Sequence, residues 1–383
     1  MSILPPQRQL FDIPPEIAYF NAAYNSPLLN SSRERLLAGA STKCHPWERN
    51  AASFFEDADT VRRLAAEVFG GDANSYAIVP SASYGASTAA RAVEPTLERG
   101  DRVVVMDEEF PSNYLPWERA VRERGAEIVT VPTPPDGDWT EAFLTHIDKH
   151  TKVIAAGHCH WTNGAFVDLA VIGKACRAAG AVLAIDVTQS LGAMPLDLDD
   201  VQPDFLYAAG YKWLLCPYGF GLLYVSERWR GSRPLEEGWL ARESAFGYFA
   251  GLVNYDSDYM IGSRRFDVGE TCTSTILPGA IAAFEQLKAW GVPAVAVTLA
   301  EINQRIAAYL EKYGFTLPPQ SVRCPHMFGA RIPENYKGNF VAELAKRNIY
   351  VSQRGSAVRF APHLHVNAHD LDRLEVALRE IVG

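Results

Sequence analysis

Short apolar runs alternate with amphipathic stretches between about residues 55 and 225. Seven of these runs have the length and the branched apolar residues of buried strands. The predicted strands are Tyr76–Val79, Arg102–Met106, Glu127–Val131, Val153–Ala156, Ala181–Ile185, Phe205–Ala208 and Gly221–Val225. Helical patterns lie between them, at Asp59–Phe69, Leu115–Arg124 and Leu169–Ala178. This alternation predicts an α/β fold: a large domain with a mostly parallel seven-stranded sheet covered by helices on both faces.

A different order of elements begins after about residue 275 and predicts a smaller C-terminal α+β domain with an antiparallel sheet. Its predicted elements are helices Pro278–Trp290 and Thr298–Tyr313, strand Met327–Ile332, helix Phe340–Arg347, strands Tyr350–Gln353 and Ala357–Phe360, and helix Leu371–Ile381. We therefore divide the chain into an N-terminal segment (1–18), a large domain (19–262) and a small domain (263–383). The stretch Gly238–Gly262 has no clear period and is long for a loop, which indicates an active-site or subunit-interface segment.

Composition narrows the class of protein. A chain of 383 residues, 48 % of them hydrophobic, can build two domains with separate cores. The net charge of −9 argues against nucleic acid as a partner, because a phosphate-binding surface needs a basic excess. No apolar run reaches the roughly 20 residues that span a bilayer. The first residues, Met1–Asp12, lack the apolar core of a signal peptide, so we expect a cytoplasmic protein.

The cysteines argue against a metal protein. The chain has six of them, and none stands in a C-x-x-C pair. In a long chain without an export signal, scattered cysteines are typical of reduced thiols rather than of a disulfide framework or a structural zinc site. We therefore expect no metal.

A carboxylate follows one of the buried strands, where Val182-Leu183-Ala184-Ile185 leads into Asp186. Sheets of this kind present ligands at the carboxyl ends of their strands. A buried carboxylate is costly without a cationic partner, and a protonated pyridine nitrogen is such a partner. The alternative is that Asp186 caps the next helix.

The next predicted strand, Phe205–Ala208, is followed by Lys212 within Gly210-Tyr211-Lys212-Trp213. A lysine that is partly desolvated in this position has a lowered pKa, so its amine can attack an aldehyde and later move an α-proton. The alternative is a lysine whose amine reaches solvent. The occurrence of Asp186 and Lys212 after neighbouring strands favours the catalytic interpretation.

Small residues join a third strand to the helix that follows it, at Pro80-Ser81-Ala82-Ser83. Free backbone N–H groups at a helix start bind phosphate, and serine hydroxyls can assist them. The signal is weak alone, because serine begins many helices.

Together, these segments resemble the class V aminotransferases, the fold-type I pyridoxal-phosphate enzymes that include cysteine desulfurases, kynureninases and isopenicillin-epimerase-like proteins. The likeness covers nearly the whole chain. It runs from Tyr19-Phe20-Asn21-Ala22-Ala23 to Val358-Arg359-Phe360-Ala361-Pro362-His363-Leu364.

The resemblance implies pyridoxal 5'-phosphate as the cofactor and assigns residues to it. Lys212 would be the Schiff-base lysine, Asp186 would pair with the pyridine nitrogen, and Gln189 would face the ring hydroxyl. The implied phosphate contacts are Ala82, Ser83 and Tyr211. Phe110 would stack on the ring, where desulfurases have a histidine.

The resemblance also implies a substrate site and a homodimer. Arg359 matches the arginine that binds the substrate carboxylate, which suits a planar bidentate donor. Asn21 and Trp161 fall on the substrate side, and Trp161 stands where many relatives have asparagine. Thr271 resembles a phosphate contact that is made across the subunit interface.

The predicted reaction is transamination of a small α-amino acid through an external aldimine. Epimerisation and β-elimination are alternatives, because the same cofactor residues serve all three reactions. Persulfide chemistry is disfavoured: the segment from Val351 to Ala357 before Arg359 has no cysteine, and Cys324 lies across a predicted strand and helix. A non-catalytic binding protein on this fold is the more distant alternative, against which the intact set of Asp186, Gln189 and Lys212 argues.

Overall fold

One seven-stranded sheet forms the centre of the large domain, in the order β2-β8-β7-β6-β5-β3-β4. The computed structural model describes residues 2–245, 249–255 and 258–383. The strands of the sheet are β2 (Tyr76–Val79), β3 (Arg102–Met106), β4 (Glu127–Val131), β5 (Thr151–Gly157), β6 (Val182–Asp186), β7 (Phe205–Ala209) and β8 (Gly221–Val225). Strands β3 to β7 pair in parallel, whereas β8 runs antiparallel to β2 and β7. The seven predicted strands and the mostly parallel sheet are thus confirmed.

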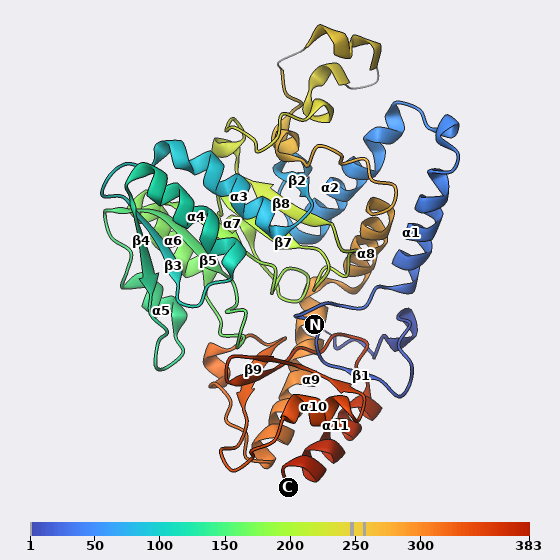
Figure 1. Ribbon diagram of the computed structural model, residues 1–383, viewed down its shortest axis with the longest axis vertical. Helices are drawn as coiled ribbons and strands as arrows, with labels where there is room; N and C mark the ends of the chain where they lie inside the picture. The colour runs from blue at the N-terminus through green and yellow to red at the C-terminus, as the bar shows by residue number, and fades with distance from the viewer. Residues whose placement is uncertain (1, 246–248, 256–257) are drawn as a thin grey trace.

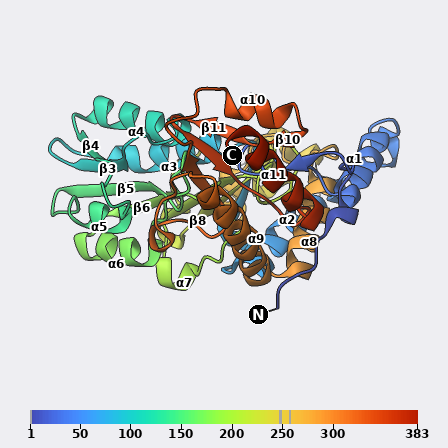
Figure 2. The same cartoon turned by 90° about the horizontal axis from the view of Figure 1, so that it is seen from below.

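Two layers of helices cover the sheet, and the alternation of side chains along each strand explains why (Figure 2). Val103 and Val105 of β3 pack on the face beneath α3 and α4, while Val104 and Met106 pack on the face that carries α2, α6 and α8. Burying each of these side chains contributes about 1.5–3 kcal/mol. The helices of the large domain are α1 (Asn30–Thr42), α2 (Glu56–Phe69), α3 (Ala82–Val93), α4 (Pro111–Arg124), α5 (Trp139–Leu144), α6 (Leu169–Ala179), α7 (Leu198–Val201) and α8 (Leu277–Trp290).

The smaller α+β domain is also confirmed. Its antiparallel sheet has the order β11-β12-β9, and a separate parallel pair joins β1 to β10. The elements are β1 (Ala18–Tyr19), α9 (Val292–Lys312), β9 (Phe328–Arg331), α10 (Phe340–Ala345), β10 (Ile349–Tyr350), β11 (Ser352–Arg354), β12 (Ala357–Phe360) and α11 (Ala368–Ile381). Figure 1 shows α9 leading from the large domain into the small one.

The core into which each segment packs indicates where the large domain ends and the small domain begins. Ala18 and Phe20 lie in the core of the small domain with Ile306 and Leu310 of α9. Helix α8, in contrast, packs into the core of the large domain. The predicted boundaries at 18 and 262 remain a prediction, and we propose that the change of domain falls within α9.

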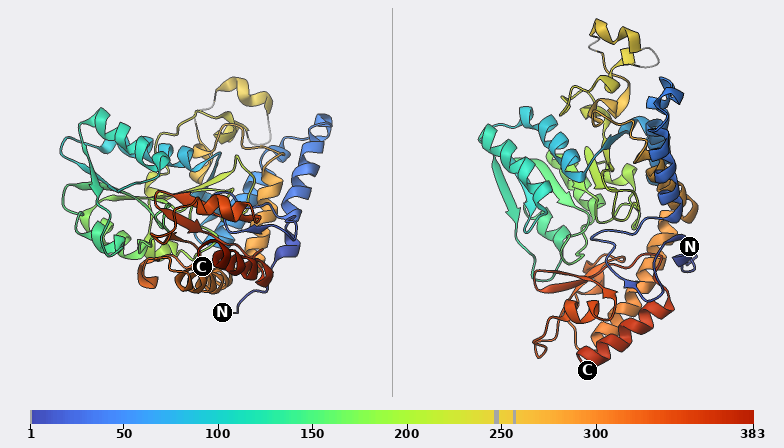
Figure 3. Two further views of the ribbon diagram at one scale, coloured as in Figure 1. Left: turned by 60° about the horizontal axis from the view of Figure 1, so that its bottom comes forward. Right: turned by 45° about the vertical axis from the view of Figure 1, so that its right-hand side comes forward.

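The segment Gly238–Gly262 forms short helical turns that extend away from the sheet, as both views of Figure 3 show. Residues 246–248 and 256–257 lie outside the described residues. A small separate core holds Leu240 and Ala245 against Phe55. The predicted role of this segment in an active site or an interface stays a prediction. Among the described residues, none of the helices combines the length and apolarity that crossing a membrane requires.

Candidate active site

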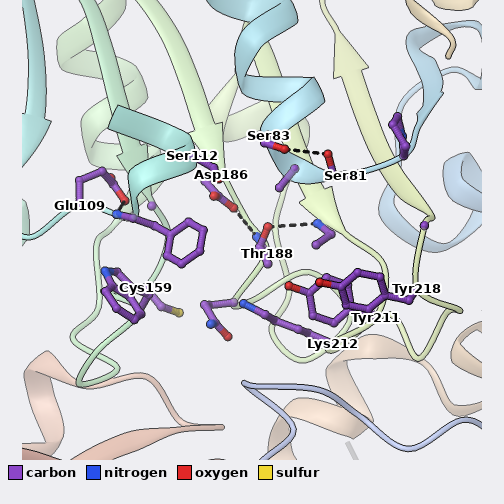
Figure 4. A pocket seen from close by; sticks show the side chains of 18 residues that line it. Ser81, Ser83, Glu109, Ser112, Cys159, Asp186, Thr188, Tyr211, Lys212 and Tyr218 are labelled. Carbon is purple, nitrogen blue, oxygen red and sulfur yellow. Dashed lines mark hydrogen bonds between the residues drawn. The ribbon is translucent and has the colours of Figure 1, made fainter. Parts of the chain in front are cut away.

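Two adjoining cavities open where β5, β6 and β7 end, and Figure 4 shows the first of them. The first, which we call the Asp186 cavity, has a volume of about 240 Å³. It is lined by Pro80, Ser81, Ala82, Ser83, Glu109, Phe110, Ser112, Gly157, Cys159, Trp161, Asp186, Thr188, Gln189, Ala209, Tyr211, Lys212, Tyr218 and Gly219. The second, which we call the Arg359 cavity, has a volume of about 210 Å³. It is lined by Ala23, Tyr24, Asn25, Phe110, Trp161, Gln189, Tyr211, Lys212, Tyr218, Arg354 and Arg359.

Asp186 is the last residue of β6 and lines the first cavity. Its Oδ1 accepts a hydrogen bond of 2.8 Å from the Thr188 N–H, within a turn and not at the start of a helix. Burial raises the pKa of Asp186, and the nearby charge of Lys212 acts in the opposite direction. No ion pair of Asp186 occurs within the described residues, so this carboxylate can accept a cationic partner in the cavity.

Lys212 follows β7 by three residues and is 9 % exposed. Burial lowers its pKa to about 8; Asp186 opposes this shift, while Arg359 and Arg354 add to it. The Nζ atom lies 5.9 Å from the centre of the Phe110 ring. A buried amine with this pKa is available in its neutral, nucleophilic form near neutral pH. The structure therefore places Lys212 on the wall shared by the two cavities, and its role as the reactive amine stays a prediction.

The N-terminus of α3 opens into the Asp186 cavity through Ala82 and Ser83. Ser81 caps the helix by accepting the Tyr84 N–H at 3.2 Å, which leaves earlier N–H groups for an anion. The helix sits directly on β7, because a Cβ at Gly85 would lie 2.5 Å from the Cβ of Tyr207. Glycine at this point thus lets the helix start approach the cavity.

Arg359 lines the second cavity from β12 and is 1 % exposed. Its Nη1 donates a hydrogen bond of 2.5 Å to the Trp161 carbonyl, while its Nε has no partner in the described part of the chain. Burial and the charge of Arg354 lower its pKa to about 9. Within the described part of the chain Arg359 has no acidic partner, so the geometry suits binding of an anion such as a carboxylate.

Three further predicted residues surround Lys212. Tyr211 stacks on Tyr218 with ring centres 4.2 Å apart. Gln189 lines both cavities, but its Nε2 donates to the Ala23 carbonyl and its Oε1 accepts from Trp213, both at 3.1 Å. Phe110 presents an exposed ring at the mouth of both cavities.

Trp161 meets the Phe110 ring edge to face, with ring centres 5.3 Å apart. Its indole N–H donates to the Glu108 carbonyl at 2.8 Å. The indole therefore offers an apolar surface to a ligand and not a hydrogen bond.

Asn21 and Thr271 are buried and do not line either cavity of this chain. Asn21 lies beside Ala361 between the domains, and its Oδ1 has no hydrogen-bond partner. Thr271 is expected to contact a phosphate across the subunit interface. The assignments of Asn21 and Thr271 therefore both stay predictions.

Sequence reasoning missed Glu109, whose carboxyl lies in the Asp186 cavity. Its Oε1 accepts the Phe110 N–H at 2.7 Å, and its buried Oε2 forms no hydrogen bond of good geometry within the described residues. Burial and the neighbouring charge of Asp186 raise the pKa of Glu109 to about 8. A signal was available, because Glu109 stands soon after a buried strand end, as Asp186 does.

The raised pKa predicts a pH-dependent stability. The folded, cofactor-free protein keeps a proton on Glu109 that the unfolded chain releases. The free energy of unfolding therefore decreases as the pH rises from 4.5 to about 8. In the original protein, Glu109 should lower the free energy of unfolding by a few kcal/mol between about pH 5 and pH 8. We expect the Glu109→Gln variant to lack this decrease. Urea unfolding at both pH values measures it, with the exposed neighbour Glu108→Gln as the control. An unchanged pH dependence in Glu109→Gln would refute the assignment.

The chain matches one protein family, several relatives and several solved structures. Residues 40–376 match the family described as "Aminotransferase class-V". The chain is 26 % identical over 225 residues to "Probable cysteine desulfurase" of Pyrococcus abyssi, covering 56 % of this chain and 55 % of that protein. It is 24 % identical over 408 positions to isopenicillin N epimerase of Streptomyces clavuligerus, covering 98 % of this chain and 97 % of the epimerase. The chain thus spans about half the length of the desulfurase and nearly all of the epimerase.

The fold is similar to that of C-DES, with a TM-score of 0.87 and 20 % identity over 98 % of this chain and 100 % of that chain. Structures of C-DES are described as a mutant with glycine covalently linked to the PLP cofactor, and as a cystine C-S lyase in complex with its product cysteine persulfide. At this identity the likeness concerns the fold.

Proposed function

The chain belongs to the class-V aminotransferase family, whose cofactor is pyridoxal 5'-phosphate, and on that premise we propose that it transaminates a small α-amino acid. The observation that carries the proposal is the position of Lys212. This buried amine lines both the cavity that holds the half-buried carboxylate of Asp186 and the cavity that holds Arg359, a buried guanidinium with no acidic partner among the described residues.

The residues of the Asp186 cavity fit the cofactor. The carboxylate of Asp186, which forms no ion pair within the described residues, would hold the pyridine nitrogen. The free N–H groups at Ala82 and Ser83 would hold the phosphate, and Lys212 would bind the aldehyde carbon. When bound, the cofactor supplies an electron-withdrawing ring that stabilises negative charge at the α-carbon of the substrate.

The chain's own residues then divide the work on the substrate. Arg359 would bind the α-carboxylate and so orient the α-carbon toward Lys212, which lines the same cavity. Lys212, whose pKa is about 8, would take the α-proton and return it to another atom. Phe110 and Trp161 would exclude water from the cavity through their apolar rings. A single base is sufficient for such a proton transfer.

β-Elimination is the second candidate, favoured by two observations. The fold likeness is to a protein described as a cystine C-S lyase, and a tight turn at Gly355 and Ser356 joins β11 to β12 just before Arg359. This turn leaves no space for a loop that could carry a cysteine. A cysteine does reach the site from another segment, because Cys159 lines the Asp186 cavity. Epimerisation would need a second acid or base, for which Glu109 is the available group.

Product analysis distinguishes the three reactions. Purified protein is incubated with a panel of small amino acids and cystine, with and without an acceptor keto acid. Transamination yields a keto acid and a new amino acid only when the acceptor is present. Ammonia and pyruvate would indicate elimination, and inverted configuration would indicate epimerisation; either result would overturn the first choice.

Arg359→Lys is expected to lower kcat/KM for an α-carboxylate substrate by about ten- to a hundredfold. Lysine replaces a planar double donor with a point charge and removes one charge-assisted bond of about 1.5–3 kcal/mol. Cofactor affinity should not change, because Arg359 does not line the Asp186 cavity. Arg354→Lys is the control, since Arg354 lines the same cavity from β11. A larger effect at Arg354 than at Arg359 would reverse the assignment.

We also propose a homodimer. Tyr24 and Tyr218 line the cavities although 57 % and 72 % of their surfaces are exposed, which supports a partner subunit that covers the site. Light scattering should give twice the chain mass of 42.2 kDa. A monomer with full activity would refute this proposal.

A further inference from the structure

Two cysteines that are 165 positions apart in the chain lie in direct contact beside the active site. The Sγ atoms of Cys159 and Cys324 are 2.7 Å apart, and the two residues are 5 % and 2 % exposed. Cys159 lines the Asp186 cavity, and Cys324 lines a separate cavity of about 120 Å³. Each residue of this pair therefore borders a cavity.

Backbone hydrogen bonds hold the two thiols in place. The segments around Cys159 and Cys324 both bind to residues 164–166. The His160 N–H donates to the Ala165 carbonyl at 2.8 Å. The Cys324 N–H donates to the Gly164 carbonyl at 2.7 Å. Gly164 has a φ of +73°, and a Cβ there would lie 2.4 Å from the Met327 carbonyl oxygen. The contact is thus built into the packing, and closing the gap to a disulfide bond of about 2.05 Å needs little movement.

A metal site fits the same atoms less well, although His326 lies beside the pair. Two thiolates that share a tetrahedral zinc ion, each at about 2.3 Å from it, stand roughly 3.7 Å apart, farther than these sulfur atoms. The Nε2 of His326 is 2.5 Å from the Gln189 carbonyl oxygen, which can only accept, so this nitrogen carries the proton. Because Nε2 also faces Cys159, at 4.0 Å, the imidazole presents an N–H and not a lone pair to the sulfur.

We propose that Cys159 and Cys324 form a redox-active thiol pair that a peroxide converts to a disulfide. Cys159, as thiolate, attacks one peroxide oxygen and becomes a sulfenic acid, while the other oxygen leaves and is protonated to water. The Cys324 sulfur then attacks the Cys159 sulfur, the S–S bond forms, and the sulfenic oxygen leaves as a second water. Two thiols are oxidised and one hydrogen peroxide is reduced, and a dithiol reverses the change. Burial raises the pKa of the Cys159 thiol, so the first step should accelerate at alkaline pH.

The disulfide would tie the chain that follows β5 in the large domain to the chain that leads into β9 in the small domain. Trp161, two residues from Cys159, holds Arg359 through its carbonyl. Oxidation would therefore restrict the segment that positions the carboxylate-binding residue. This proposal does not depend on the proposed reaction, because it concerns only the two thiols.

Trypsin separates the two cysteines, which allows a direct test. Cleavage after Lys152 and Lys174 releases a peptide with Cys159, and cleavage after Arg323 and Arg331 releases one with Cys324. The full-length protein is treated with hydrogen peroxide, unreacted thiols are alkylated, and the digest is analysed by mass spectrometry. We expect these two peptides joined, about 2 Da lighter than their sum, and separated by dithiothreitol. We also expect a reversible increase in Tm on oxidation, because the bond closes a long loop.

Variants complete the test. Cys324→Ala and, should it not fold, Cys159→Ala are expected to lose both the joined peptide and the increase in Tm. Cys176→Ala is the matched control, since Cys176 is equally buried and contacts no other cysteine among the described residues, and it should behave like the original protein. Absence of the joined peptide under conditions that oxidise the exposed Cys44 would overturn the proposal. So would stoichiometric zinc that protects both thiols from alkylation.

Discussion

Changing Lys212 to alanine is expected to lower turnover by about 10²–10⁴-fold, because proton transfer by a positioned base contributes an effect of this size. Lys212 is the lysine that lines both cavities among the residues that the structure describes, so no other amine can replace it. The measurement is the rate with the best substrate of the amino-acid panel.

Two comparisons make this result specific to the amine. Lys288→Ala removes an exposed lysine that is paired with Glu67, and it should leave the rate unchanged. A small primary amine added to the Lys212→Ala protein should restore part of the rate, because it can occupy the space that the side chain leaves. If Lys212→Ala retained a rate within tenfold of the original, Lys212 would not be the base.

Asp186→Ala should lower kcat by about 10²–10³-fold, a loss of roughly 3–4 kcal/mol, because the ring nitrogen would lose its counter-charge. The Tm of the cofactor-free protein should change little, because removing a desolvated carboxylate offsets the loss of its hydrogen bond from the Thr188 N–H and of its attraction to Lys212. Steady-state kinetics and thermal unfolding measure the two effects.

Asp168→Ala is the matched control for Asp186. Asp168 caps α6 by accepting the N–H groups of Ala170 and Val171 at 3.0 and 3.1 Å. Its replacement should cost about 1 kcal/mol of stability and leave turnover unchanged. If Asp186→Ala behaved in the same way, the capping alternative would be correct and the cofactor assignment wrong.

The sequence was most informative where burial determines the residue type. The seven strands were found within two residues of their observed ends, because each strand has apolar neighbours on both faces. Helix α1 was not predicted. It packs through small residues, and at Gly39 a Cβ would lie 1.9 Å from the Ser274 carbonyl oxygen, so no apolar stripe marks it.

The same distinction holds at the site. Asp186 ends a strand, Lys212 and Ser83 follow strand ends, and the topology of the sheet brings such residues to one edge. The contact between Cys159 and Cys324 depends on how two loops pack, and no local pattern records it. It was therefore missed when the cysteines were read as scattered along the chain.

Reduction with borohydride, followed by peptide mapping, tests the central claim most directly. Protein that has been reconstituted with pyridoxal 5'-phosphate is reduced, digested and analysed by mass spectrometry. The structure predicts that the cofactor becomes fixed to Lys212 and that no other lysine carries it. A label on a different lysine, or no label after full reconstitution, would contradict the assignment of this cavity as the cofactor site.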